Sequence, residues 1–166
     1  MHVAAASGNL EEVEKILKED PEQYKQLTTP STSSLYEDRA YSGATALHYA
    51  LLKKQYHVAK RLLQHSAANE IINIPNSATE SILCLIVSLE NERNASELAK
   101  LALTIKGIDI NFSSSWLEEH STSLSIACNA MNLEITRLLL DHGANANISG
   151  DLNNQGYAVD HPNHYM

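Results

Sequence analysis

The stretch from residue 121 to residue 147 sets the strongest constraint on how this chain can fold. It holds two apolar runs at helical spacing, residues 124–128 and 133–140, with only a few polar residues between them. Gly143 follows the second run, at a position where a left-handed residue commonly ends a helix. The pattern predicts a helix, a tight turn and a second helix. A hairpin of this size cannot bury both apolar faces alone, so it must stack on neighbouring copies.

Copies of this unit occur elsewhere in the chain. The clearest segments are residues 43–50, which read GATALHYA, and residues 138–147, which read LLLDHGANAN. They resemble the ankyrin repeat, a unit of about 33 residues with a D-x-x-G-x-T-P-L-H-x-A-A first half and a second helix ending L-L-x-x-G-A-D-x-N. Residues 1–10 resemble the first half without its hairpin, and residues 81–85 occupy the T-P-L-H-x positions of a third copy. The resemblance implies an all-α solenoid of about four stacked helix-turn-helix units, with hairpin or finger loops and irregular insertions.

The resemblance also divides the chain. It predicts one domain over residues 1–166, and its repeats are expected at 1–20, 40–73, 76–111 and 116–148, with a degenerate fifth start at 153–158. The units are longer than the family's, so the excess is expected as loops in the segments 21–41 and 112–120. A chain that starts within one unit and stops at the start of another is typical of a domain from a longer protein, and a natural half-repeat cap at the N-terminus is the alternative.

Several local features are predicted within this frame. A short helical turn is expected around residues 22–27, before a polar finger at 28–34. Thr45 is expected to cap a helix, and the resemblance gives His48 a structural role close to it. The helix that contains residues 58–63 lacks a closing glycine and is expected to fray or to run on toward Asn69.

The third unit is the most divergent. Residues 82–89 are almost continuously apolar, as the inner helix of a covered middle repeat should be, and the following turn, 90–95, is expected to be longer than the family's. The serine-rich segment 112–116 is expected to be a loop. Its Trp116 either clasps the loop to the solenoid or stays exposed as an anchor for a partner.

Composition excludes several functions. The formal net charge of -8 and the absence of a clustered basic stripe argue against a nucleic-acid partner. No apolar run reaches the 18 or so residues of a membrane helix, and the N-terminus lacks the pattern of a signal peptide. Cys84 and Cys128 both fall on apolar helix faces, so we expect buried, reduced thiols in a cytoplasmic protein.

Few residues of this scaffold are good candidates for catalysis or metal binding. A cysteine nucleophile would need a nearby base, but both thiols are expected to face other helices. His161 and His164 offer two ligands near Asp160, which is too few for a good metal site. We therefore expect no catalytic residue, no metal, no cofactor and no small-molecule substrate.

A partner protein is expected instead, on the concave face that the hairpins and inner helices form. The chain by itself is expected to be a monomer. The resemblance places partner-facing positions at its variable slots, and Tyr41, Leu52 and Leu89 are the apolar anchors among them. The predicted binding residues are Tyr41, Ser42, Leu52, Lys53, Ser77, Glu80, Leu89, Trp116, Glu118, Glu119 and Asn129, and Ala44, Ser88 and Ala130 occupy further slots of the same kind.

The function expected from the sequence is that of a non-catalytic protein-interaction module. By analogy, worn repeats and an Asn-rich, Gly-poor composition also suit the ankyrin region of a bacterial effector that acts on host proteins in the host cytosol. The alternative is the recognition arm of a larger enzyme whose catalytic domain lies outside these residues.

Overall fold

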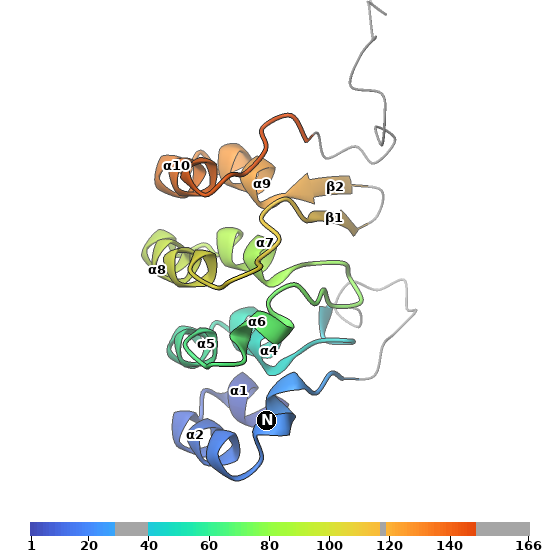
Figure 1. Ribbon diagram of the computed structural model, residues 1–166, viewed down its shortest axis with the longest axis vertical. Coiled ribbons are helices and arrows are strands. Elements are labelled where there is room, and N and C mark those ends of the chain that lie inside the picture. The colour runs from blue at the N-terminus through green and yellow to red at the C-terminus, as the bar shows by residue number, and fades with distance from the viewer. Residues whose placement is uncertain (29–39, 117–118, 149–166) are drawn as a thin grey trace, which may run out of the picture.

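The structure is a computed structural model that describes residues 1–28, 40–116 and 119–148, and it describes only the backbone at residues 115, 116, 119 and 120. Eight helices of the described residues form four antiparallel pairs, stacked in one column (Figure 1). The first helix of each pair lies in an inner layer and the second in an outer layer (Figure 1). This arrangement is the all-α solenoid that the sequence predicts.

The inner layer consists of α1 (His2–Ser7), α4 (Ala46–Leu52), α7 (Ile82–Val87) and α9 (Ser123–Asn129). The outer layer consists of α2 (Leu10–Glu19), α5 (Tyr56–Leu63), α8 (Glu92–Leu103) and α10 (Leu133–Asp141). The connections contain the 3-10 helix η1 (Pro21–Lys25), the short helix α6 (Ala68–Ile71) and the antiparallel strands β1 (Ser113–Trp116) and β2 (Glu119–Thr122).

Side-chain caps explain where the helices begin. In α4, the Thr45 hydroxyl accepts the amide hydrogen of His48, and the Thr45 amide donates to Nδ1 of the His48 ring, 3.1 Å away. This reciprocal cap confirms the predicted role of Thr45 and the structural role of His48. Hydroxyl caps also start the other inner helices after the first, and asparagine caps start three outer helices; these residues are Ser81, Thr122, Asn9, Asn91 and Asn132.

The core runs through the column between the two layers. Every residue of α7 is buried, as expected for the inner helix of a middle repeat, and Leu47 and Leu83 occupy equivalent buried positions in consecutive units. Tyr24 of η1 closes the gap beside the first two units, because its buried hydroxyl donates to the Leu62 carbonyl at 2.8 Å. The predicted helical turn near residues 22–27 is therefore present as η1.

Polar contacts link neighbouring units along two edges of the column. At the edge that follows the outer helices, the Asn73 amide bonds to the backbone of residues Gly107 and Asp109, and the Asn111 side chain accepts the Asn145 amide. At the hairpin edge, the Ser77 amide donates to the Ser42 carbonyl at 2.8 Å. Each link joins one unit to the next, so it fixes the register of the stack.

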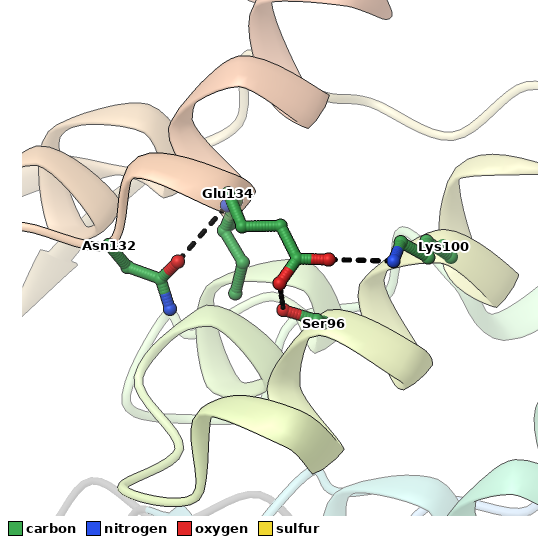
Figure 2. A network of polar contacts seen from close by, with 5 residues as sticks. Ser96, Lys100, Asn132 and Glu134 are labelled. Carbon is green, nitrogen blue, oxygen red and sulfur yellow. Dashed lines mark hydrogen bonds and ion pairs between the residues drawn. The ribbon is translucent and has the colours of Figure 1, made fainter.

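Ion pairs link the outer helices from unit to unit. Glu14 of α2 pairs with Arg61 of α5, and Lys60 of α5 pairs with Glu97 of α8. Lys100 of α8 pairs with Glu134 of α10 at 2.7 Å. Figure 2 shows this last junction, where the second carboxylate oxygen of Glu134 also accepts a hydrogen bond from Ser96.

Three expectations about connections are wrong. The turn expected at residues 90–95 is misplaced, because Asn91 caps α8 and the helix begins at Glu92, although its four residues make it longer than the three-residue turn between α4 and α5. The helix α5 neither frays nor runs on toward Asn69, since it ends at Leu63 and a separate short helix, α6, follows. The serine-rich segment is a strand and not a loop, because β1 pairs with β2 over four residue pairs. The polar finger expected at 28–34 lies outside the described residues from Thr29 onward.

Burial in the last unit is also lower than predicted. Cys128 is exposed, contrary to the expectation of a buried thiol, and Leu133 and Leu140 of the predicted apolar face are exposed as well. Leu101 and Leu138, expected in the core, are only partly buried against it. In the last unit, the physical reason is that no further described unit covers its outward side (Figure 1).

Candidate interaction surface

A groove lies between the second and third units, on the face formed by their inner helices. It encloses about 170 Å³ between the C-terminal ends of α4 and α7. Its apolar lining comes from Leu51, Leu52, Leu85 and Leu89, and its polar lining from Lys54, Glu80, Ser88 and Glu90. The predicted anchors Leu52 and Leu89 therefore face the same groove, together with the predicted positions Glu80 and Ser88.

An ion pair stands at the rim of this groove. Lys54 Nζ lies 2.9 Å from a carboxylate oxygen of Glu90 in the next unit. Because Lys54 donates a hydrogen bond to Glu90, the pKa of the Glu90 carboxyl is lowered and the pKa of the Lys54 amine is raised. Both side chains are well exposed, so the pair adds little stability and both charges are accessible to a partner.

Tyr41, the third predicted anchor, belongs to an aromatic cluster in the second unit. Its ring is half-buried and lies 5.2 Å from the Tyr49 ring, and Lys53 Nζ lies 4.7 Å above its centroid. The Tyr49 ring in turn meets His2 of the first unit edge-on at 5.3 Å. Tyr41 is thus a packed side chain with one accessible side, rather than a freely exposed anchor, and Lys53 is exposed beside it.

The remaining predicted positions of these two units are involved in structural contacts. Ser42 and Ser77 are partly buried and join neighbouring units through their backbones. The Glu80 carboxylate accepts a hydrogen bond from the Asn76 side chain at 3.0 Å. Ala44 is fully buried, so the expectation that it faces a partner is wrong.

The predicted positions of the fourth unit lie apart from the groove. Asn129 and Ala130 are exposed at the C-terminal end of α9. Trp116 and Glu119 are paired by their backbones at the end of the β1–β2 hairpin. Their side chains, and the whole of Glu118, lie outside the described part of the structure, so the choice between a clasp and an anchor for Trp116 stays open.

Sequence reasoning missed three contributors to this surface. Tyr49 occupies the variable position after His48, and its aromatic side chain could have indicated a place on this surface. The pairing of Lys54 with Glu90 joins residues 36 positions apart, which no helical spacing reveals. Leu85 was recognised as apolar, but a continuous apolar run does not show which member borders a groove.

The described residues offer little chemistry for catalysis or metal binding. They contain no group of three or more His, Cys, Asp or Glu side chains placed to hold a metal ion. Burial raises the pKa of the Cys84 thiol, whose sulfur lies 3.4 Å from the Ser123 hydroxyl. Among the described segments, none of the helices is long and apolar enough to cross a membrane.

A column of helical hairpins with a groove on its inner-helix face defines a helical-repeat scaffold of the protein-binding class. The family model for the ankyrin repeat matches residues 42–77 and 119–151. These residues are ankyrin repeats, as the sequence indicated. Ankyrin repeats are generally modules of protein–protein interaction.

Two curated proteins are similar to the chain. Transient receptor potential cation channel subfamily A member 1 of Homo sapiens is 31% identical over 144 residues, which cover 87% of this chain and 11% of that protein. E3 ubiquitin-protein ligase KEG of Arabidopsis thaliana is 34% identical over 109 residues, which cover 63% of this chain and 6% of that protein. The chain thus spans about a tenth or less of the length of either relative.

Proposed function

We propose that this chain is a non-catalytic interaction module that binds a partner protein in the groove between α4 and α7. The observation that carries the proposal is the convergence of Leu52, Leu85 and Leu89 on one accessible hollow. An apolar hollow with charged groups at its rim suits an apolar side chain of a partner, held in place by polar contacts around it.

The charges at the rim give the groove its selectivity under this proposal. Lys54 and Glu90 offer one charge of each sign, and Lys53 lies next to Tyr41 on the same side of the second unit. A partner with a positive and a negative side chain beside an apolar residue can form ion pairs with Glu90 and Lys54. These new pairs then replace the exposed Lys54–Glu90 pair. Because that pair is solvated, its rearrangement costs little.

The test begins with a partner recovered by pull-down with the wild-type chain. Replacing Leu89 or Leu52 with Ala should weaken the measured affinity for that partner by about tenfold or more, equal to roughly 1.4 kcal/mol. Isothermal titration measures the affinity, and thermal melts confirm that each variant is folded. Unchanged affinity for both variants would contradict the proposed site.

The control substitutions belong on the outer layer. Glu14 and Lys60 are unsuitable controls, because both form ion pairs between units, so replacing them also changes the stack. Lys15→Ala is a better control, because Lys15 is exposed on α2 and forms no ion pair with the described residues. It should leave the affinity within about twofold.

An alternative function is that of the recognition arm of a larger enzyme. The observation in its favour is the similarity to an E3 ubiquitin-protein ligase of which the chain covers only a small part. The full-length reading frame decides between the two: a catalytic domain in the same polypeptide would favour the alternative. A cytoplasmic location and an origin as a bacterial effector also stay predictions, which imaging of the tagged protein in host cells would check.

A further inference from the structure

The outer helices of the last two units carry the same charge pattern in register. In α8, Glu97 directly precedes the buried Leu98, and Lys100 follows Glu97 by three positions. In α10, Glu134 directly precedes a buried isoleucine, and Arg137 follows Glu134 by three positions. Both outer helices therefore present a carboxylate and, one turn later, a cation at equivalent places.

This register couples the last three units in one direction. The cation of one unit pairs with the carboxylate of the next, as Lys60 does with Glu97 and Lys100 with Glu134 (Figure 2). The first junction is reversed, because Glu14 of the first unit pairs with Arg61 of the second. Arg137 holds the same position as these lysines in the last described unit. It is exposed, and within the described residues it forms no ion pair.

The other end of the column presents the matching half of the pattern. In α2, Glu11 holds the place of Glu134, because each is the second residue after the asparagine that caps its helix, Asn9 or Asn132. The Glu11 side chain is exposed, and no described residue forms an ion pair with it. The column therefore ends in an unused carboxylate at its N-terminal side and an unused cation at its C-terminal side.

Apolar side chains accompany the unused charges at the C-terminal end. Leu140 is 46% exposed, whereas Leu63 and Leu103, which hold its position in units with a following neighbour, are 4% and 7% exposed. Cys128 is exposed, but Leu51 and Val87 at the equivalent inner-helix position are buried.

The N-terminal end shows the same contrast. Val3 of α1 is 83% exposed, whereas Leu85, the equivalent residue of α7, is 6% exposed because the preceding unit covers it. At each end of the column, side chains are therefore exposed whose equivalents are buried at an interior junction.

We propose that these two ends bind each other, so that a second copy of the chain stacks head to tail on the first, with Glu11 of the second copy against Arg137. The contact continues the junction already formed between the third and fourth units, with the same direction of charge pairing. This proposal replaces the expectation of a monomer and is independent of the groove between α4 and α7.

The physical balance makes the association weak and reversible. A single exposed ion pair contributes about 0–1 kcal/mol, so most of the attraction must come from the apolar side chains that become covered. The charges chiefly fix the register and make association sensitive to salt. Because the contact joins two different surfaces, it does not close on itself, and longer stacks form as the concentration rises.

Sedimentation velocity on the full chain tests the proposal. Between about 5 and 500 µM at low salt, a range suited to a weak contact, the weight-average sedimentation coefficient should rise and fall again when salt is added. Labelling of Cys128 by a thiol reagent should slow over the same concentration range, because the stacked copy covers that thiol.

Charge reversal identifies the contact. Arg137→Glu and Glu11→Arg should each weaken self-association by about tenfold or more. An equimolar mixture of the two variants should associate again, because opposite charges meet at both kinds of junction between unlike copies. Lys106→Glu and Glu19→Arg are matched controls, because they change the net charge equally at exposed positions and should leave association within about twofold.

Two results would overturn the proposal. One is a chain that sediments as a monomer over the whole range, which is also the outcome if a further repeat of the same polypeptide covers the C-terminal end. The other is self-association that neither charge reversal changes, since another surface would then hold the copies together. Thermal melts of the four variants show whether each keeps its fold.

Discussion

Acid should destabilise the fold well above the pH at which carboxylates titrate, and His48 is the main cause. The ring is fully buried, and Nδ1 accepts the Thr45 amide hydrogen, so Nδ1 carries no proton and Nε2 does. Burial lowers the pKa of His48 to about 4. The backbone of Glu80 in the next unit opposes this shift, although Nε2 lies outside strict hydrogen-bonding geometry.

The sign and size of the effect follow from this shift. The pKa of histidine in an unfolded chain is about 6.5, so the unfolded state takes up a proton at a pH where the folded state does not. The stability contributed by neutral His48 is complete above pH 6.5 or so and is lost as the pH falls toward the folded-state value of about 4. Between pH 7.5 and 5.5 the loss amounts to about 1.4 kcal/mol.

Urea denaturation at each pH measures this loss as a change in the free energy of unfolding. Burial also lowers the pKa of His2 and of His65, so these residues add to the effect in the same direction. His48→Asn keeps a side-chain acceptor for the Thr45 amide but does not titrate, and it should remove most of the dependence. His142→Asn, at an exposed position, is the matched control.

The loss of stability from the carboxylate ion pairs falls outside this pH range. Hydrogen bonds from lysines lower the pKa of Glu90, Glu97 and Glu134, so the stability from those pairs is present above about pH 4.5 and is lost below it. A wild-type chain whose free energy of unfolding is equal at pH 7.5 and 5.5 would refute the reasoning. So would a His48→Asn variant that keeps the full dependence.

Two further predictions follow from burial. Leu83→Ala should lower the free energy of unfolding by about 2–5 kcal/mol, whereas Leu138→Ala, at a partly buried position, should cost less than half as much; denaturation curves that gave equal losses would contradict the assigned core. In dilute protein, Cys128 should react with a thiol reagent at least about a hundredfold faster than Cys84, with Cys128→Ser as the control, because Cys84 is buried and burial raises the pKa of its thiol.

The sequence predicted the interior of the column well because burial there is encoded within each unit. The hydroxyl cap at Thr45, the apolar helix α7 and the stacked leucines all follow from local spacing. The connection after α7 was predicted poorly, because the position and length of this turn were judged from the family pattern. The better signal was Asn91 before Glu92, an N-cap followed by an acidic first turn.

Exposure at the ends could not be predicted from one unit. Cys128 and Leu140 have the residue types of core positions, and equivalent residues are buried wherever another unit follows. Their exposure depends on the neighbour and not on the local pattern. The groove was predictable in part, since Leu52 and Leu89 occupy variable positions, but Lys54 meets Glu90 only because the units stack in this register.

The long connection between α8 and α9 does not disturb the groove, because its β1–β2 hairpin lies on the opposite edge of the inner layer (Figure 1). The groove forms where α4 and α7 end, and only three residues there separate α4 from α5 and four separate α7 from α8. The long connections instead lead into the next inner helix, as the β1–β2 hairpin does before α9 (Figure 1). Short turns fix Leu52 and Leu89 relative to each other through the buried helices behind them. The specificity proposed for the groove therefore depends on a few side chains at its rim and not on the variable loops.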